Sequence, residues 1–174
     1  MFETMLVPLD GGPPSDVALD AVRQLAQTSS RHVVLCHVVD TLADAVVSAQ
    51  GFIDPAGVIE NDEREGLQLL SLGRERLSGA DVRVDTVLAE GRPVEAILRV
   101  AVERGAELIV MGSHGRAGIA RAILGSVTEG VLRKSPVPVL VVRAPAHASG
   151  QRGPSSGASS AALGAPRGPL PEPQ

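Results

Sequence analysis

The stretch Glu107-Leu108-Ile109-Val110-Met111-Gly112-Ser113-His114-Gly115 sets a run of aliphatic residues directly before two glycines. A short, continuous apolar run that ends at a turn signal is typical of a strand buried on both faces of a sheet. Similar signals mark four further expected strands, over 5–9, 32–39, 82–89 and 138–142. The run at 107–111 is therefore the fourth of five predicted strands.

Amphipathic stretches separate these strands. The expected helices run from Ser15 or Asp16 through 26, from Asn61 or Asp62 to about 79, from 93 to 105, and over 127–133. Strands and helices that alternate in this way predict an α/β fold with a parallel sheet, and right-handed crossovers make the sheet doubly wound. Ligands of such sheets lie beyond the carboxyl ends of the strands, where the winding reverses. The loops after the first, second and fourth strands are the places to look for a site.

Two glycine-containing turns follow the fourth strand. Gly112 and Gly115 are expected to adopt positive φ and to let the main chain approach a ligand closely. Gly125 and Ser126 precede the last helix, whose first turn offers unpaired N–H groups and a partial positive charge to an anion. Ser126 and Thr128 add hydroxyl donors. This segment predicts a phosphate site; the alternative is that its glycines only form a tight turn and a helix cap.

These residues resemble the ATP-binding branch of the universal stress protein family. Gly112, Gly115, Gly125 and Ser126 match the family pattern G-x2-G-x9-G-[S/T] without a gap. Three other segments resemble the first strand, the end of the second strand and the closing strand of that family, namely 6–11, 36–39 and 135–142. The resemblance covers 4–143. It implies an adenine-nucleotide α-hydrolase-like fold, with five parallel strands in the order 3-2-1-4-5.

The resemblance also implies how an adenine nucleotide binds. The residues expected at the base and ribose are Pro8, Leu9, Asp10, Val38 and Met111, with Asp10 accepting from the sugar hydroxyls. Those expected at the ribose and the first phosphate are Gly112, His114 and Gly115; those at the outer phosphates are Gly125, Ser126, Val127 and Thr128. The expected ligand is ATP, with ADP or AMP as alternatives, and Mg²⁺ or Mn²⁺ would be held through phosphate oxygens. Gly12 stands where family members commonly have serine, although Ser15 remains.

Several of these side chains have more than one interpretation. Asp10 either binds ribose or caps nearby amides of its own loop. His114 either contacts phosphate, as expected of a histidine beside glycines, or acts as a general base. His37, at a strand end, is expected to be structural, and the apolar run around Cys36 predicts a buried, unreactive thiol.

Composition excludes several other classes of protein. The net charge is −4, and no Lys/Arg cluster offers the basic surface that nucleic acid requires. No window approaches the ~18 apolar residues of a membrane span, and a single cysteine fits a reducing compartment, so a cytoplasmic location is expected. No spacing of His, Cys, Asp or Glu resembles a protein metal site. Because P-loop and G-x-S-x-G motifs are also absent, no catalytic residue is assigned.

The expected organisation is one nucleotide-binding domain over 1–143, followed by a disordered tail rich in Pro, Ala, Gly and Ser over 144–174. The predicted function is that of an ATP-binding regulatory protein of the stress response, in which occupancy acts as a switch. The alternative is a slow ATPase, or an enzyme that phosphorylates itself at Ser126 or Thr128. The strand at 137–142 is expected at a sheet edge, where it would pair with a second copy to form a homodimer.

Overall fold

The computed structural model describes residues 2–28, 30–41, 55–113 and 124–143, and it contains one five-stranded parallel sheet. The strands are β1 (Thr4–Pro8), β2 (Arg31–Val39), β3 (Val82–Glu90), β4 (Leu108–Gly112) and β5 (Val139–Val142). Their spatial order is β3-β2-β1-β4-β5, so the predicted order is confirmed. The predicted tail at 144–174 lies outside the described residues.

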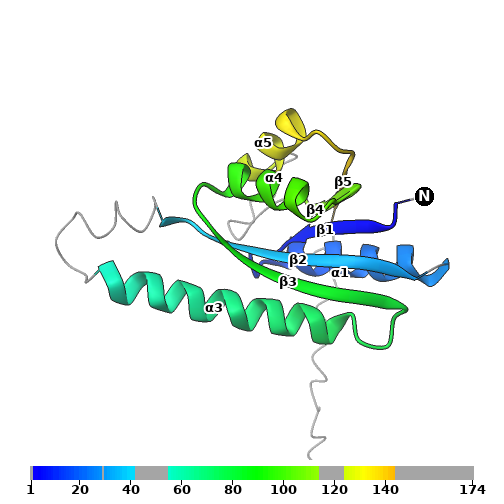
Figure 1. Ribbon diagram of the computed structural model, residues 1–174, viewed down its shortest axis with the longest axis horizontal. Coiled ribbons are helices and arrows are strands. Elements are labelled where there is room, and N and C mark those ends of the chain that lie inside the picture. Colours follow the sequence, from blue (N-terminus) through cyan, green and yellow to red (C-terminus); the bar gives the residue numbers. More distant parts are fainter. Residues whose placement is uncertain (1, 29, 42–54, 114–123, 144–174) are drawn as a thin grey trace, which may run out of the picture.

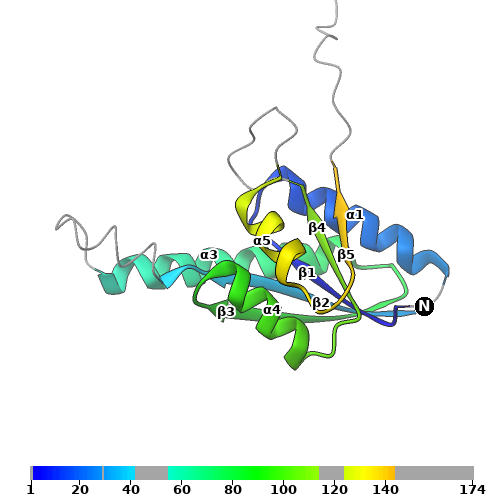
Figure 2. The same ribbon diagram turned by 90° about the horizontal axis from the view of Figure 1, so that it is seen from above.

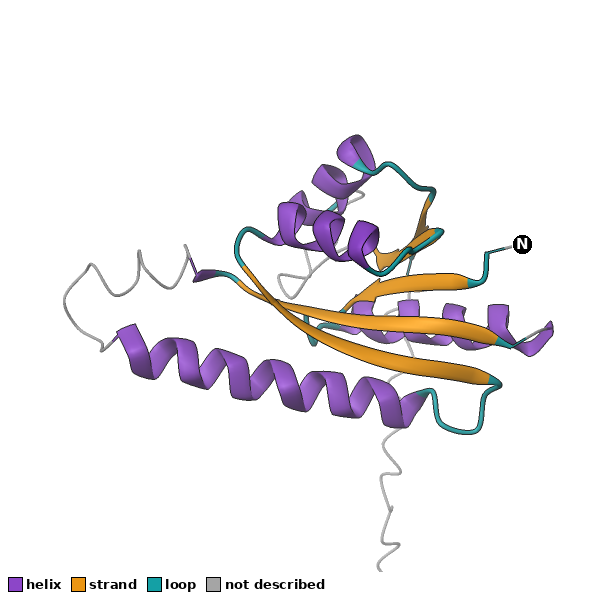
Figure 3. Ribbon diagram, viewed as in Figure 1, coloured by secondary structure: helices purple, strands orange, loops and turns teal. Residues whose placement is uncertain are grey.

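Helices cover both faces of the sheet. They are α1 (Pro13–Leu25), the short 3-10 turn η1 (Ala26–Thr28), α3 (Pro55–Arg76), α4 (Pro93–Glu103) and α5 (Ser126–Lys134). Figure 1 shows α1 and α3 on one side of the sheet and α4 and α5 on the other, and Figure 3 shows the same layers coloured by secondary structure. Seen from above in Figure 2, α1 crosses β4 and β5, while α3 runs along β2 and β3. The sheet is therefore doubly wound.

Successive side chains of the central strands point to opposite faces of the sheet, so the domain has one hydrophobic core on each face. The residues under α1 and α3 include Val7, Leu35 and Val110, and those under α4 and α5 include Leu6, Val34 and Ile109. All six are fully buried. Burial of one such aliphatic side chain contributes roughly 1.5–3 kcal/mol relative to exposure. Strands that are apolar on both sides are thus explained by a sheet with helices on both faces.

An ion-pair cluster joins α1 to α3. Arg76 at the end of α3 places Nη1 2.9 Å from Asp16 Oδ1 and Nη2 3.1 Å from Asp20 Oδ1. The positions of α3 that are buried, Gly66, Leu70 and Gly73, also belong to its later part, whereas none of residues 59–65 is fully buried. The carboxyl-terminal half of α3 is therefore the half that is attached to the rest of the domain.

Two helices begin earlier than the sequence predicts. Helix α1 starts at Pro13 with Gly12 as N-cap and no side-chain cap, so neither Ser15 nor Asp16 is the cap. Proline fits the first helical position because its missing N–H would have no partner there. Helix α3 starts at Pro55 rather than at Asn61 or Asp62. The polar residues around 61 lie inside this helix, where Arg64 pairs with Glu60 one turn earlier at 3.0 Å.

Gly112 is required for packing and not for a positive φ. The described glycines with positive φ are Gly11, Gly79, Gly91 and Gly105, so the prediction for Gly112 is wrong. A Cβ atom on Gly112 would instead collide with Pro14 at the start of α1, lying 2.5 Å from the Pro14 carbonyl oxygen and against its Cβ. Only glycine lets the end of β4 touch the first turn of α1.

Cys36 is buried, as predicted, and burial raises the pKa of its thiol to about 12. The thiolate is the reactive form of cysteine, so this thiol is inert at neutral pH. In the part of the chain that the structure describes, no helix is long and apolar enough to cross a membrane.

Replacement of Gly112 by alanine should lower the free energy of unfolding by ~1–3 kcal/mol, because the new methyl group must displace the main chain at Pro14. Gly130→Ala is the matched control. Its Cβ would meet a side-chain methyl of Val94 at 2.7 Å, which can shift, and alanine is favoured over glycine inside a helix. Urea unfolding followed by circular dichroism measures both variants, and equal stabilities would contradict the packing role of Gly112.

Candidate functional site

The carboxyl ends of β1 and β4 lie side by side at the centre of the sheet. The chain leaves β1 to form α1 on one face, and it leaves β4 toward α5 on the opposite face (Figure 1). Since the helices that follow these two strands lie on opposite faces, the winding reverses between β1 and β4, and the ends of such strands are the usual ligand position in open α/β sheets. The sequence placed its candidate residues in these two connections.

The loop after β1 is held together by Asp10 and Ser15. Asp10 Oδ1 accepts from the Gly12 N–H at 3.0 Å and from the Ser15 hydroxyl at 2.6 Å, while the Asp10 N–H donates to Ser15 Oγ at 3.0 Å. Gly11, with φ of +74°, makes the turn between them. The capping role that the sequence left open for Asp10 is therefore present, and recognition of ribose by Asp10 stays a prediction. Ser15 is the loop residue whose importance the sequence understated.

Leu9 is fixed to the sheet on three sides. Its N–H donates to the Cys36 carbonyl at 2.7 Å, and its carbonyl accepts from Nδ1 of His37 at 2.8 Å. Its side chain is buried in the core under α1 and α3. Leu9 thus shapes the predicted pocket through its main chain, while the half-buried Pro8 ends β1 beside it.

The start of α5 presents main-chain donors near the end of β4. The Gly125 N–H donates to the Ser113 carbonyl at 2.9 Å, and the first helical bond runs from the Glu129 N–H to the Gly125 carbonyl at 2.9 Å. The N–H groups of Ser126, Val127 and Thr128 therefore have no acceptor within the helix. They form the partly positive end of the helix, and such an end favours an anion.

Ser113 and Thr128 hold this helix start against β4 and β5. The Ser113 N–H donates to the Val142 carbonyl at 2.9 Å, and the Thr128 hydroxyl donates to the Gly112 carbonyl at 3.1 Å. Both residues are buried. The buried Thr128 therefore attaches the first turn of α5 to the end of β4, whereas the Ser126 side chain is exposed to solvent. The role of Ser113 is carried by its main chain, so no side-chain pattern in the sequence could have revealed it.

Two predicted residues of the base pocket lie on the face of the sheet that α5 covers. Met111 is buried in the core under α4 and α5, and the half-buried Val38 packs against the same core. The structure thus brings most predicted residues to one edge of the sheet, on the adjacent strands β2, β1 and β4 and the start of α5. His114 and Gly115 lie outside the described residues.

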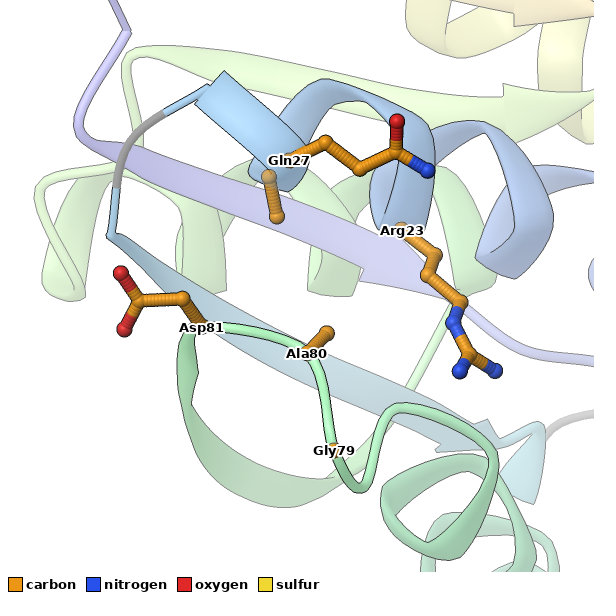
Figure 4. Close-up of a pocket in the computed structure, with 6 residues that line it drawn as sticks. Arg23, Gln27, Gly79, Ala80 and Asp81 are labelled. Atoms are coloured by element: carbon orange, nitrogen blue, oxygen red, sulfur yellow. The ribbon is translucent and has the colours of Figure 1, made fainter.

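The opposite edge of the sheet carries a hollow of about 290 Å³ at the amino ends of the strands. It is lined by Arg23, Ala26 and Gln27 from the end of α1 and η1, and by Gly79, Ala80 and Asp81 before β3 (Figure 4). This hollow is separate from the candidate site, because the hollow lies at the amino ends of the strands and the candidate site lies at their carboxyl ends. Over the described ranges, no group of three His, Cys, Asp or Glu residues is placed to hold a metal ion.

Replacement of Thr128 by valine should cost ~1–3 kcal/mol of stability, because it leaves the Gly112 carbonyl without its hydroxyl donor. Thr128→Ser keeps the hydroxyl and should stay within ~1 kcal/mol of the parent protein. Thermal and urea unfolding measure both variants. If Thr128→Val is as stable as the parent protein, or if Thr128→Ser is the less stable of the two variants, the hydrogen bond to the Gly112 carbonyl is not what holds the helix start.

Comparison with known proteins agrees with this geometry. The model of the universal stress protein family matches residues 1–143. Universal stress protein YxiE of Bacillus subtilis is 37% identical over 151 residues, which cover 82% of this chain and 100% of that protein.

Solved structures give the same result. The structure of MJ0577 from Methanocaldococcus jannaschii matches with a TM-score of 0.75 and 29% identity, over 84% of this chain and 99% of that one. A universal stress protein in complex with cAMP matches with a TM-score of 0.57 and 26% identity, over 82% and 97% of the two chains. The sequence match over the whole described domain and the shared strand order lead to one conclusion: this chain belongs to the universal stress protein family.

Proposed function

We propose that this protein binds an adenine nucleotide, ATP above all, at the carboxyl ends of β1 and β4, and that occupancy acts as a switch in a stress response. The observation that carries the proposal is the start of α5, where three successive N–H groups without a helical acceptor lie beside the divergence of β1 and β4. A polyphosphate is a ligand of matching charge. A relative of this chain was crystallised with cAMP, which supports an adenine nucleotide as the ligand class.

The proposed pose follows from the placement of the strands. Val38 and Met111 lie on the same face of the sheet as α5, so the base would contact these two side chains while the phosphates reach the helix start. The sugar would then lie over the ends of β1 and β4, near Asp10 and Gly112. In this pose the main chain of Gly125 to Thr128 binds the outer phosphates. Any Mg²⁺ or Mn²⁺ would be bound through phosphate oxygens rather than by side chains.

We expect the switch to depend on binding and release of the nucleotide rather than on its hydrolysis. Phosphoryl transfer requires a positioned nucleophile and a charge that stabilises the transition state. The described residues around the helix start supply main-chain donors and the exposed Ser126 hydroxyl. We therefore favour a regulatory role over the alternative of a slow ATPase or self-phosphorylating enzyme.

Replacement of Ser126 by proline should weaken ATP binding about tenfold or more, because it removes one N–H donor from the phosphate site. Proline suits the first position of a helix, and Gly125 already has the extended backbone, φ −57° and ψ 147°, that a residue before proline needs. The fold should therefore be retained. Isothermal titration with ATP, ADP and AMP measures the affinities, and AMP should be least affected because it lacks the outer phosphates.

Ser126→Ala is the matched control, since it removes the hydroxyl but keeps the N–H. It should bind ATP more tightly than Ser126→Pro. Absence of ATP binding by the parent protein, or equal affinity of all three proteins, would argue against the proposal.

A second experiment separates regulation from catalysis. After hours of incubation with the protein, chromatography should recover the ATP intact, and the protein should carry no phosphate. Release of ADP would favour the enzymatic alternative.

We also propose that two copies associate through the strand at 137–142. Strand β5 is at the edge of the sheet, as predicted, and among the described residues it pairs with β4 on one side only. It is aliphatic throughout, and Leu140 on it is 38% exposed. An aliphatic edge strand is a template for pairing with another chain. A homodimer would cover this edge.

Leu140→Lys should convert the dimer to a monomer, because it places a charge on the proposed interface. Leu72→Lys is the control, since Leu72 is an exposed leucine of α3, on a different part of the surface. Light scattering at micromolar concentration measures the mass of each protein. A monomeric parent protein, or a dimer that survives Leu140→Lys unchanged, would contradict this interface.

A further inference from the structure

A continuous set of contacts runs from α3 through the His37 ring to the loop after β1. Nδ1 of His37 lies 2.8 Å from the Leu9 carbonyl oxygen. On its other side the ring touches α3 at Gly66, where an added Cβ would lie 2.5 Å from His37 Cδ2 and 2.7 Å from a methyl group of Leu88. The absence of a side chain at Gly66 is therefore what lets the helix lie directly on the imidazole.

The chemistry of this contact fixes the state of the ring. A carbonyl oxygen can only accept, so Nδ1 must carry the proton and donate it to Leu9. The acceptor belongs to the residue directly before Asp10. Because the Leu9 N–H also donates to the Cys36 carbonyl, both main-chain groups of Leu9 are bound to β2.

The loop beyond Leu9 is braced by bonds of its own, and the first turn of α1 that follows it packs at Pro14 against Gly112 of β4. Asp10, Gly12 and Ser15 bond to one another and form a small unit that continues into α1. The direction in which this unit leaves β1 depends on how Leu9 is held. The His37 side chain bonds to the Leu9 carbonyl, one residue before Asp10, so it is placed to influence where the carboxylate of Asp10 lies.

We propose that His37 is a positioning residue of the nucleotide site, which sets the Leu9–Asp10 turn through its Nδ1–H and is itself held in place by α3 at Gly66. This inference rests on the proposed binding of an adenine nucleotide. It assigns no contact between His37 and the nucleotide. It makes the affinity for ATP depend on a hydrogen bond on the face of the sheet opposite to α5.

His37→Leu and His37→Asn test the inference as a pair. Leucine fills the space but cannot donate, so ATP affinity should fall about tenfold by isothermal titration. The amide nitrogen of asparagine stands near the place of Nδ1 and can donate to the same carbonyl, so His37→Asn should recover most of the affinity. In the free parent protein, long-range ¹H–¹⁵N spectra of the imidazole should show a proton on Nδ1 of His37.

The outcomes separate the two proposals. Loss with leucine and recovery with asparagine supports the positioning role. Unchanged affinity in His37→Leu, equal loss in both variants, or a proton on Nε2 alone overturns that role while nucleotide binding stands. Failure of the parent protein to bind ATP overturns both.

Gly66→Ala tests the support from α3. Its methyl group should push the ring away from Leu9 and weaken ATP binding several-fold, although no residue of the candidate site has changed. Ser71→Ala, at an exposed position of the same helix, is the control and should bind ATP like the parent protein. Equal affinity of the two variants would show that α3 does not hold the ring in place.

Discussion

The contact between Gly112 and Pro14 is the constraint on which the rest of the site depends. It brings the end of β4 against the first turn of α1 without any side chain between them. The central strands β1 and β4 can therefore send their following helices to opposite faces at the same place. The carbonyl of the same glycine receives the Thr128 hydroxyl, which seats the start of α5. One residue without a side chain thus aligns both halves of the candidate site.

The predicted strands follow from local pattern alone, because an aliphatic run such as 107–111 has few alternatives to a strand covered on both sides. Their order in the sheet came instead from the resemblance to the universal stress protein family, and the structure confirms it. The starts of α1 and α3 were harder, since each helix begins at a proline, Pro13 or Pro55, before the polar residues that the sequence offered as caps. The sequence also singled out Gly112, but the positive φ expected of it is wrong, and the structure shows a packing contact with Pro14 instead. Local periodicity contains no information about which distant helix a glycine touches.

The candidate site was predictable in position but not in construction. Its donors are largely main-chain groups, as at Ser126 and Val127, and its supports are bonds between distant residues, as from His37 to Leu9. A glycine spacing indicates where a main chain can approach a ligand, whereas the partners of that main chain depend on the folded structure. Asp10 shows the difference, because either of its two interpretations fits the same sequence and only the folded loop reveals its bonds to Gly12 and Ser15.

The uneven attachment of α3 has a consequence for local unfolding of the domain. Arg76 and the buried Leu70 attach the later part of the helix, which runs toward the amino edge of the sheet, whereas no residue over 59–65 is buried. Local unfolding begins where few apolar groups are buried, so α3 should open over residues 59–65 before it opens near Arg76. This part of α3 lies toward the same edge of the sheet as the proposed nucleotide site, so a nucleotide bound there would be expected to slow its amide hydrogen exchange.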